Sequence, residues 1–538
     1  MADFFIRTED IKADEILDYF VETSQDRAIV STLKARNPVV LAGSRGVGKS
    51  FLLRVAQAEL LAKFDQNRVF PVYETFAKSS LIHTNDPRQF QHWMLARLCS
   101  GILRSLTKEG LLAVIPPSLL LLAGDRAAPV HPEKTAIEKI ADFFEQSWQA
   151  PGSSVDVSAL PSVEVFKEAV EDICAQLRIS RFTVFIDEAA HIFLPEQQRQ
   201  FFTLFRDLRS PYISCNAATY PGVTAFGETF QPFHDATMLT LDRDILSVDY
   251  VQNMREIVEK QAEDSTIMSN IAKNGQNFAT LAYAASGNPR LLLKTLTRAG
   301  KVNSQQTSEV IREYYRNDIW SEHSALGEKY AGHQSMIDWG RRFIEAEVLP
   351  ELQRKNVQYL ASDLKTTCFF WIQRDAPEPV KEALRLLAYT GIVSEHSTGI
   401  KATRSEIGTR YAVNLGCLLA LEATPAVSGF EIARSLTVKR MSEYGPNHAV
   451  YQDLLANVPR FEEATVSMVL DRQLAKPIDV LDITPWQKSR LRDLSLNTVG
   501  DVLMATETKL QQAWYVGEKR SRRMRNAAIA AVYEYLSG

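Results

Sequence analysis

Eight consecutive residues form the strongest candidate for chemistry in this chain. The segment GSRGVGKS places three glycines ahead of a lysine and a serine. Glycines let a backbone curl until its N–H groups point at phosphate oxygens, and a helix that starts at the lysine adds its positive dipole end. The lysine would reach the β- and γ-phosphates of a nucleotide, and the serine hydroxyl would hold Mg²⁺. The residues are Gly43, Ser44, Arg45, Gly46, Val47, Gly48, Lys49 and Ser50.

The elements on either side of this segment are those that a phosphate loop needs. An apolar run at residues 38–42 predicts a strand before it, and apolar spacing over residues 49–61 predicts an amphipathic helix after it. A chance match in a glycine-rich turn is the alternative. Because a strand, a loop and a helix occur in the required order, we expect the segment to bind phosphate.

A second acidic motif supplies the other half of a hydrolytic site. The run VFIDE at residues 184–188 ends a strongly β-forming segment. A carboxylate at the tip of a buried strand, here Asp187, can hold Mg²⁺ through water, and Glu188 would polarise the attacking water as a general base. An ordinary strand that ends in an acidic turn is the alternative. The paired carboxylates favour hydrolysis, and the sequence lacks a guanine-reading Asn-Lys-x-Asp motif, so ATP is the expected substrate.

Strand candidates at residues 38–42, 69–73, 182–186 and 212–216 alternate with helical segments, which indicates a mostly parallel sheet covered on both faces. The order of these elements resembles the AAA+ and STAND classes of ATPases, and more nearly the origin-recognition-type AAA+ ATPases. The resemblance rests on residues 43–50, 185–188 and the SGNPR segment at 286–290, and covers residues 15–320, more weakly to 425. A long helical insertion before Asp187 departs from a minimal AAA+ module.

The resemblance implies roles for three further kinds of residue. Arg290 would reach the γ-phosphate from a lid domain, and Asn216, or else Thr219, would be the polar sensor after the fourth strand. Arg206 and Arg209 would be candidates for an arginine finger toward a neighbouring subunit. The alternatives are a solvated arginine at an Asn-Pro helix start, an asparagine that caps a strand end, and solvated arginines on a helix face.

The chain divides into five expected units. They are a core at 1–244, a helical lid at 245–333, a winged helix at 334–425, a helical linker at 426–477 and a C-terminal unit at 478–538. In the winged helix, strand-like segments at 392–395 and 411–415 flank a polar stretch at 396–399 that predicts a turn. In the resembled family this domain contacts DNA, which here would involve Arg374, Lys381, Arg385 and Lys401. A solvated surface or a wing that contacts protein is the alternative.

The C-terminal unit resembles the C-terminal domain of the bacterial RNA polymerase alpha subunit, a helix-hairpin-helix fold that binds the DNA minor groove. The resemblance rests on NTVGDVL at 497–503 and WYVGEK at 514–519. Nine basic and six acidic residues from 481 onward give a net charge of +3, against −4 for the whole chain. Trp486 stands where the family has its minor-groove arginine, which favours contact with the DNA backbone, and a protein-docking domain is the alternative. The expected DNA contacts are Arg492, Gly517, Lys519, Arg522 and Arg523.

Bulk properties restrict the remaining functions. The 538 residues carry five scattered cysteines without metal-ligand spacing, which predicts free buried thiols. The first residues do not form a signal peptide, and the apolar stretch at 110–124 is too short to cross a bilayer, so a cytoplasmic protein without a membrane partner is expected.

The expected fold is therefore an α/β P-loop NTPase core with an AAA+-like parallel sheet, followed by a helical lid, a winged helix and a helix-hairpin-helix domain. The expected function is an ATPase that uses ATP and Mg²⁺ and couples nucleotide state to double-stranded DNA, with a partner effector protein and a homo-oligomer as further expectations. By analogy, such ATPases occur in bacterial mobile elements and anti-phage systems. A STAND-like switch that assembles with or senses a protein partner is the alternative, and an architectural transcription-associated factor is a third.

Overall fold

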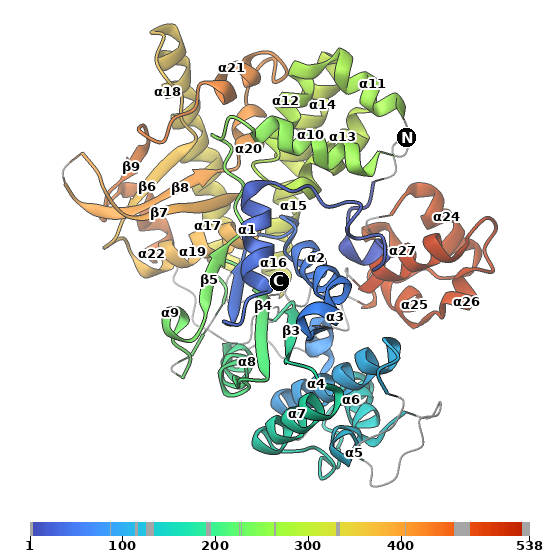
Figure 1. Cartoon of the computed structure of the whole chain (residues 1–538). Helices are drawn as coiled ribbons and strands as arrows, with labels where there is room; N and C mark the ends of the chain where they lie inside the picture. Colours follow the sequence, from blue (N-terminus) through green and yellow to red (C-terminus); the bar gives the residue numbers. More distant parts are fainter. Residues whose placement is uncertain are drawn as a thin grey trace.

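The computed structural model describes residues 4–84, 86, 88–112, 117–124, 134–189, 195–224, 226–227, 229–262, 265–329, 334–403, 405–456, 474–481 and 483–529. Five parallel strands form its central sheet, in the order β2-β3-β4-β1-β5 (Figure 1). The strands are β1 (Val39–Ala42), β2 (Val69–Thr75), β3 (Arg181–Asp187), β4 (Ile213–Thr219) and β5 (Thr237–Thr240). This arrangement is an α/β P-loop NTPase core, as the sequence predicts.

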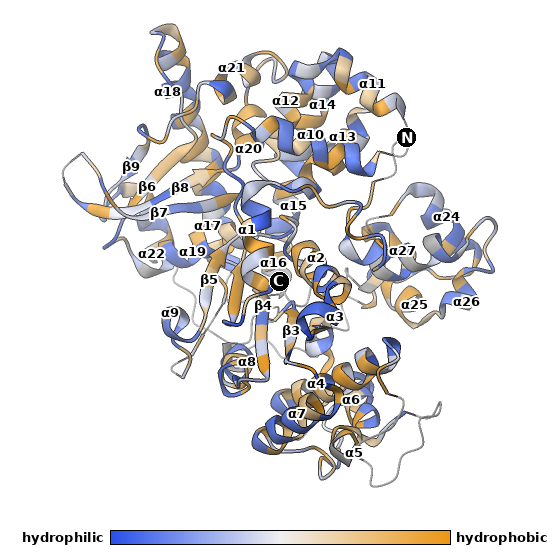
Figure 2. Ribbon diagram, in the orientation of Figure 1, coloured by the Kyte–Doolittle hydropathy of each residue, from blue (hydrophilic) through white to orange (hydrophobic). Residues whose placement is uncertain are grey.

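Apolar residues alternate between the two faces of the sheet, and each face is covered by its own helices. On one face, Val39 and Leu41 pack with helices α1 (Ser24–Leu33) and α2 (Lys49–Ala62). On the other, Val40 packs in a larger cluster with helices α4 (Gln89–Lys108), α5 (Pro117–Ala123), α6 (Ala136–Gln146), α7 (Val163–Leu177) and α8 (Pro195–Asp207). Figure 2 shows the apolar character of these strands. A sheet covered on both faces needs largely apolar strands. The inner strands β1, β3 and β4 are buried almost throughout, whereas the edge strand β5 has only two apolar residues.

Helices dominate the chain after β5. They are α10 (Tyr250–Gln261), α11 (Ser265–Lys273), α12 (Gly275–Ala284), α13 (Pro289–Ala299), α14 (Ser304–Glu313) and α15 (Ile319–Ser324). One continuous hydrophobic cluster joins these helices to the following unit, from Tyr250 to Leu454. The boundary expected at residues 333/334 therefore falls inside a shared core.

A second sheet follows in the order β7-β8-β6-β9, built from β6 (Phe369–Gln373), β7 (Val393–Lys401), β8 (Ile407–Val413) and β9 (Ser442–Tyr444). Helices α17 (Gln334–Arg342) and α19 (Glu378–Tyr389) pack against each other beside it. The turn predicted at 396–399 is wrong, because β7 continues through it. Irregular pairing near Ser397 and a left-handed Gly399 let polar residues remain in the strand.

The expectation of a helical linker at 426–477 is also wrong in part. Helices α21 (Ser428–Arg434) and α22 (Gln452–Ala456) are present, but β9 lies between them and pairs with β6 in parallel. The strand has only three residues, so its alternation is too short to stand out in the sequence. Residues 457–473 lie outside the described part of the chain.

The C-terminal unit contains a short turn η8 (Ile478–Val480) and helices α24 (Pro485–Asp493), α25 (Val499–Met504), α26 (Glu507–Leu510) and α27 (Glu518–Ile529). Its small core extends to Ala77 and Leu81 of the 3-10 helix η2 (Ala77–Leu81), which follows β2. Helix α27 also contacts the 3-10 turn η1 (Thr8–Asp10) near the N-terminus. In Figure 1 this red unit lies beside the blue N-terminal segment. The unit therefore touches the core at two places far apart in sequence.

All five cysteines are buried and free, as predicted. Within the described residues, no helix is long and apolar enough to cross a bilayer.

Candidate nucleotide-binding site

The glycine-rich segment forms the turn between β1 and α2. Gly46 and Gly48 have φ angles of +84° and +107°, a region that side-chain-bearing residues rarely adopt. Helix α2 starts at Lys49, directly after this turn, so its free backbone N–H groups face the loop. A Cβ on Gly46 would lie 2.9 Å from the Cβ of Arg290 and 2.9 Å from Asn288 Oδ1. Glycine at position 46 thus serves both the loop conformation and the close approach of α13.

Lys49 is buried, with 6% of its surface exposed, and its ammonium group contacts the loop itself. Nζ donates to the carbonyl oxygens of Gly43 at 2.6 Å and Ser44 at 3.1 Å, and lies 4.0 Å from the centre of the Tyr220 ring. Burial lowers the pKa of Lys49 to about 7, an effect that the charges of Asp187 and Glu188 oppose and that Arg290 and Arg45 reinforce. A phosphate oxygen next to this buried ammonium group would stabilise its charged form.

The two carboxylates follow each other at the carboxyl end of β3. Asp187 is buried, and its Oδ2 accepts a hydrogen bond from the Tyr73 hydroxyl at 2.6 Å. Burial and the charge of Asp187 raise the pKa of Tyr73 well above its usual range, so this phenol remains a donor. Glu188 lines the pocket with a left-handed backbone, at φ +56°, which is a strained conformation for a residue with a side chain. Glu188 therefore lines the same pocket as Lys49 and Ser50.

The oxygen donors at this end of the sheet fit Mg²⁺. The Ser50 hydroxyl begins α2 beside Lys49, and the Asp187 carboxylate terminates β3. Magnesium prefers few protein oxygens together with water and phosphate, which two such groups leave room for. Among the described residues, no group of three or more His, Cys, Asp or Glu side chains could hold a metal by itself. The donor set therefore suits a metal that a nucleotide brings with it.

Helix α13 brings the helical unit after β5 to the glycine-rich loop. Asn288 caps this helix through its Oδ1, which accepts from the N–H of Leu291, and its Nδ2 donates to the Arg45 carbonyl at 2.7 Å. Arg290 then points into the pocket, and its Nε donates to the Ile6 carbonyl at 3.3 Å. The Arg45 side chain pairs with Glu322 of α15 at 2.7 Å. The glycine-rich loop is therefore held to the helical unit after β5 at two points.

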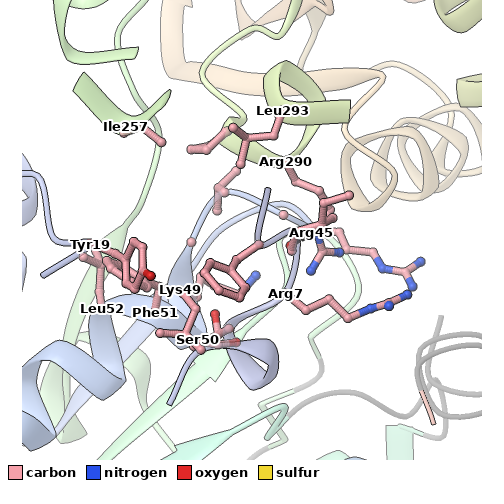
Figure 3. Close-up of a pocket in the computed structure, with 18 of the residues that line it drawn as sticks. Arg7, Tyr19, Arg45, Lys49, Ser50, Phe51, Leu52, Ile257, Arg290 and Leu293 are labelled. Carbon is pink, nitrogen blue, oxygen red and sulfur yellow. Dashed lines mark hydrogen bonds between the residues drawn. The ribbon is translucent and has the colours of Figure 1, made fainter. Parts of the chain in front are cut away.

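The N-terminal segment completes the pocket, a contribution that no local pattern in the sequence reveals. We call residues 5–11 the strap. Most of the strap lines the pocket, including Arg7, which is 9% exposed. Figure 3 shows Arg7, Arg45 and Arg290 on one side, and the apolar Tyr19, Phe51 and Leu52 on the other. Positive charge at one end and apolar surface at the other suit the phosphates and the base of a nucleotide.

The pocket is open in part to solvent and lies between the strap, the glycine-rich loop and α13. A second residue missed by sequence reasoning, Arg243, supports its floor. The Arg243 guanidinium pairs with Asp26 of α1 at 3.1 Å and donates to the Val47 carbonyl. Because Asp26 and Arg243 are 217 residues apart, sequence spacing gives no sign of the pair.

One expected site residue, Asn216, lies away from the loop. Asn216 is in the interior of β4, paired with Val39, and its Nδ2 donates to the Leu33 carbonyl at 2.9 Å, so the structure does not bring it to the loop. The strand continues to Thr219, whose carbonyl accepts from the Gly43 N–H, so the second-choice sensor is the one beside the loop. Arg206 binds Asp207 and the Thr229 carbonyl, and neither it nor Arg209 is among the described residues that line the pocket. Both are candidates for a finger toward a neighbouring subunit, and that role stays a prediction.

The candidate DNA contacts of the C-terminal unit lie on or beside two of its helices, α24 and α27. Arg492 on α24 pairs with Asp479 at 2.5 Å. Gly517 is exposed and directly precedes α27, which carries Arg523. Lys519 and Arg522 also lie on this helix, but their side chains are outside the described residues. The structure thus places these candidates in one small unit, at the start of α27 and on α24.

Comparison with known proteins gives one family match. Residues 5–76 match a family model described as ORC-CDC6-like. None of the curated proteins compared matches the chain. Among solved structures, a Walker-type ATPase of Pyrococcus abyssi is 14% identical, with 80% of this chain and 98% of that chain covered and a TM-score of 0.38.

Two further solved structures are similar to the same degree. The Aeropyrum pernix Orc1 protein, solved in complex with DNA, is 14% identical, with 78% and 95% covered and a TM-score of 0.31. Thermotoga maritima RuvB is 12% identical, with 73% and 94% covered and a TM-score of 0.28. Likeness of this degree assigns no function. The family match itself spans the strap, the phosphate loop, α2 and β2, and ends before the lid, the second sheet and the C-terminal unit.

Proposed function

We propose that this protein is an AAA+-type ATPase that binds and hydrolyses ATP and couples its nucleotide state to DNA binding by its C-terminal units. One observation carries the ATPase part. Lys49, Ser50, Glu188 and Arg290 come from a loop, a helix start, a strand end and a lid helix, yet all four line one pocket. A nucleotide-binding loop alone would explain the first two residues. The glutamate and the lid arginine add the groups that hydrolysis requires.

The residues divide the chemistry as follows. Backbone N–H groups of the loop and the start of α2 would bind the β- and γ-phosphates, and Lys49 would leave its own loop carbonyls for a phosphate oxygen. Ser50 and Asp187 would hold Mg²⁺, which neutralises the charge that develops on the phosphates. Glu188 would orient the attacking water and take its proton. Arg290 would stabilise the γ-phosphate from the lid, so that lid position depends on the nucleotide.

The strap supports the coupling to DNA. Its pocket side reaches Arg290 through the Ile6 carbonyl, and its turn η1 touches α27 of the C-terminal unit. A change at the γ-phosphate that moves Arg290 would therefore act on the strap, which contacts the C-terminal unit. The start of α27 would bind the DNA backbone at Gly517 together with Lys519, Arg522 and Arg523, and Arg492 would add a contact from α24. The winged-helix-like second sheet would supply a further contact surface.

The test is the rate of ATP hydrolysis by the full-length protein, with and without double-stranded DNA. We expect hydrolysis that depends on Glu188 and is stimulated by DNA. Hydrolysis that ignores DNA and responds only to a protein partner would favour the STAND-like switch. Absence of nucleotide binding would refute the assignment of the pocket.

A further inference from the structure

An exposed aromatic surface on the C-terminal unit has no role in the function proposed so far. Trp514 and Tyr515 are 72% and 69% exposed, although both are large apolar rings in a small unit with its own core. Trp486 lies close by, and two arginines, Arg490 and Arg520, accompany the three rings. We call these five residues the Trp514 surface. Neighbouring exposed rings on a well-packed unit indicate a binding surface.

The arginines lie against the rings in an ordered way. The Arg520 guanidinium is 4.6 Å from the centre of the Tyr515 ring and 5.2 Å from that of Trp486. The Arg490 guanidinium is 5.7 Å from the Trp486 ring and 6.0 Å from the Trp514 ring, and it also pairs with Asp493 at 3.0 Å. The Trp514 and Tyr515 rings are 5.6 Å apart and inclined by 34°, so they do not cover each other.

The backbone holds this arrangement at some cost. Tyr515 has a φ of +61°, a left-handed conformation that a tyrosine adopts with strain. Its carbonyl accepts a hydrogen bond from Arg520 at 2.8 Å, which fixes the turn ahead of α27. Two residues later, a Cβ built on Gly517 would meet no described atom within 4 Å. Open backbone at the start of the 12-residue helix α27 therefore lies next to the rings.

We propose that the Trp514 surface stacks unpaired nucleobases, so that the protein binds single-stranded DNA, or a melted region, in preference to intact duplex. Bases within a duplex are already stacked on both faces, whereas an unpaired base offers a free face to an aromatic ring. The guanidinium groups beside the rings and the open start of α27 would hold the adjoining phosphates. This inference rests on the proposed DNA binding of the C-terminal unit and specifies which form of DNA that unit binds.

The test compares one fluorescein-labelled oligonucleotide of mixed sequence as a single strand and as a duplex, by fluorescence anisotropy of the full-length protein at one fixed salt concentration. Loss of one stacked base weakens binding by roughly 5- to 150-fold. Trp514→Ala should therefore weaken binding of the single strand by this factor and change duplex binding less than twofold. Trp514→Phe, which keeps a ring, should restore most of the single-strand affinity.

Phe233 offers a matched control, because it is 86% exposed and lies on α9 (Pro232–Asp235), outside the C-terminal unit. Phe233→Ala should leave both affinities unchanged. Equal losses for both DNA forms in Trp514→Ala, or none, would overturn the stacking role and leave the surface to a protein partner. Tight duplex binding without single-strand binding by the unaltered protein would overturn this inference alone. If the unaltered protein binds neither DNA form, the proposed DNA binding of the C-terminal unit is itself refuted.

Discussion

The protein should take up a proton when it binds a nucleotide at pH 8, because Lys49 is largely neutral in the nucleotide-free protein. Burial lowers the pKa of this ammonium group to about 7, so at pH 8 roughly nine-tenths of the protein carries neutral lysine. Triphosphate oxygens beside Nζ favour the charged form and would return the pKa toward its usual value. The bound state thus holds a proton that the free state lacks. By linkage, affinity for ATP is greatest below pH 7 as far as Lys49 is concerned and falls as pH rises above 7.

The structure also sets the size of the effect. One proton taken up per site weakens binding by at most tenfold for each pH unit, and a pKa near 7 gives roughly ninefold between pH 8 and pH 9. This pH range lies above the second pKa of phosphate, about 6, so ionisation of the nucleotide contributes little to the pH dependence of binding. Isothermal titration calorimetry at pH 8 in two buffers of different ionisation heat would count the proton directly.

Lys49→Arg supplies the control, because a guanidinium group does not titrate in this range. Its affinity for ATP should be weaker and flat between pH 8 and pH 9. Thermal unfolding would show that the variant is folded. Two results would refute the claim that Lys49 is largely neutral in the nucleotide-free protein. One is a binding enthalpy of the unaltered protein that does not depend on the buffer, and the other is the same pH dependence of ATP affinity in Lys49→Arg.

The remaining predictions concern the loop and the carboxylate beside it. Glu188→Gln should bind ATP with little change and lose hydrolysis by about 10²- to 10⁴-fold, because an amide cannot take the proton of water; single-turnover hydrolysis measures this, and undiminished turnover would exclude Glu188 as the base. Gly46→Ala should abolish ATP binding and lower the free energy of unfolding by about 1–3 kcal/mol, because a Cβ at φ +84° would collide with Asn288 and Arg290. Denaturant unfolding would report the second effect, and normal stability would contradict the collision.

Local chemistry explains which parts of the site the sequence predicts. Lys49, Ser50, Asp187 and Glu188 belong to short contiguous motifs whose spacing is set by a loop or a strand end, so each could be located without a fold. The sheet followed from apolar runs long enough to stand out. β5 did not, because four residues with only two apolar side chains make a weak strand pattern. The same limit on short strands hid β9.

Positions that depend on strand ends or on distant contacts escaped prediction. Ending β4 three residues early put Asn216 at its tip, whereas the strand continues through an apolar Ala217-Ala218 pair to Thr219. Element boundaries are the least reliable part of a periodicity argument. The Asp26–Arg243 pair and the strap over the pocket are tertiary contacts, which residue spacing does not encode.

The strap leads to the last prediction, because Arg290 is hydrogen-bonded to the strap and also lines the pocket. Its Nε now donates to the Ile6 carbonyl, and a turn of the guanidinium toward a γ-phosphate would weaken that hydrogen bond. The strap would then be held less firmly to the pocket. The packing of α27 against η1 would weaken as a result. Hydrogen exchange of Glu188→Gln with and without ATP should therefore show faster exchange in residues 5–11 and 518–529.

Helix α7 should not respond, because it covers the far face of the sheet, and it serves as the internal reference. Adding Arg290→Ala to the same protein should abolish the ATP-dependent change in both segments while the reference stays constant. A response confined to residues 5–11 would mean that the strap senses the nucleotide without informing the tail. In that case the contact between η1 and α27 would be a structural support, and the coupling of ATP to DNA would have to pass through the lid and the second sheet instead.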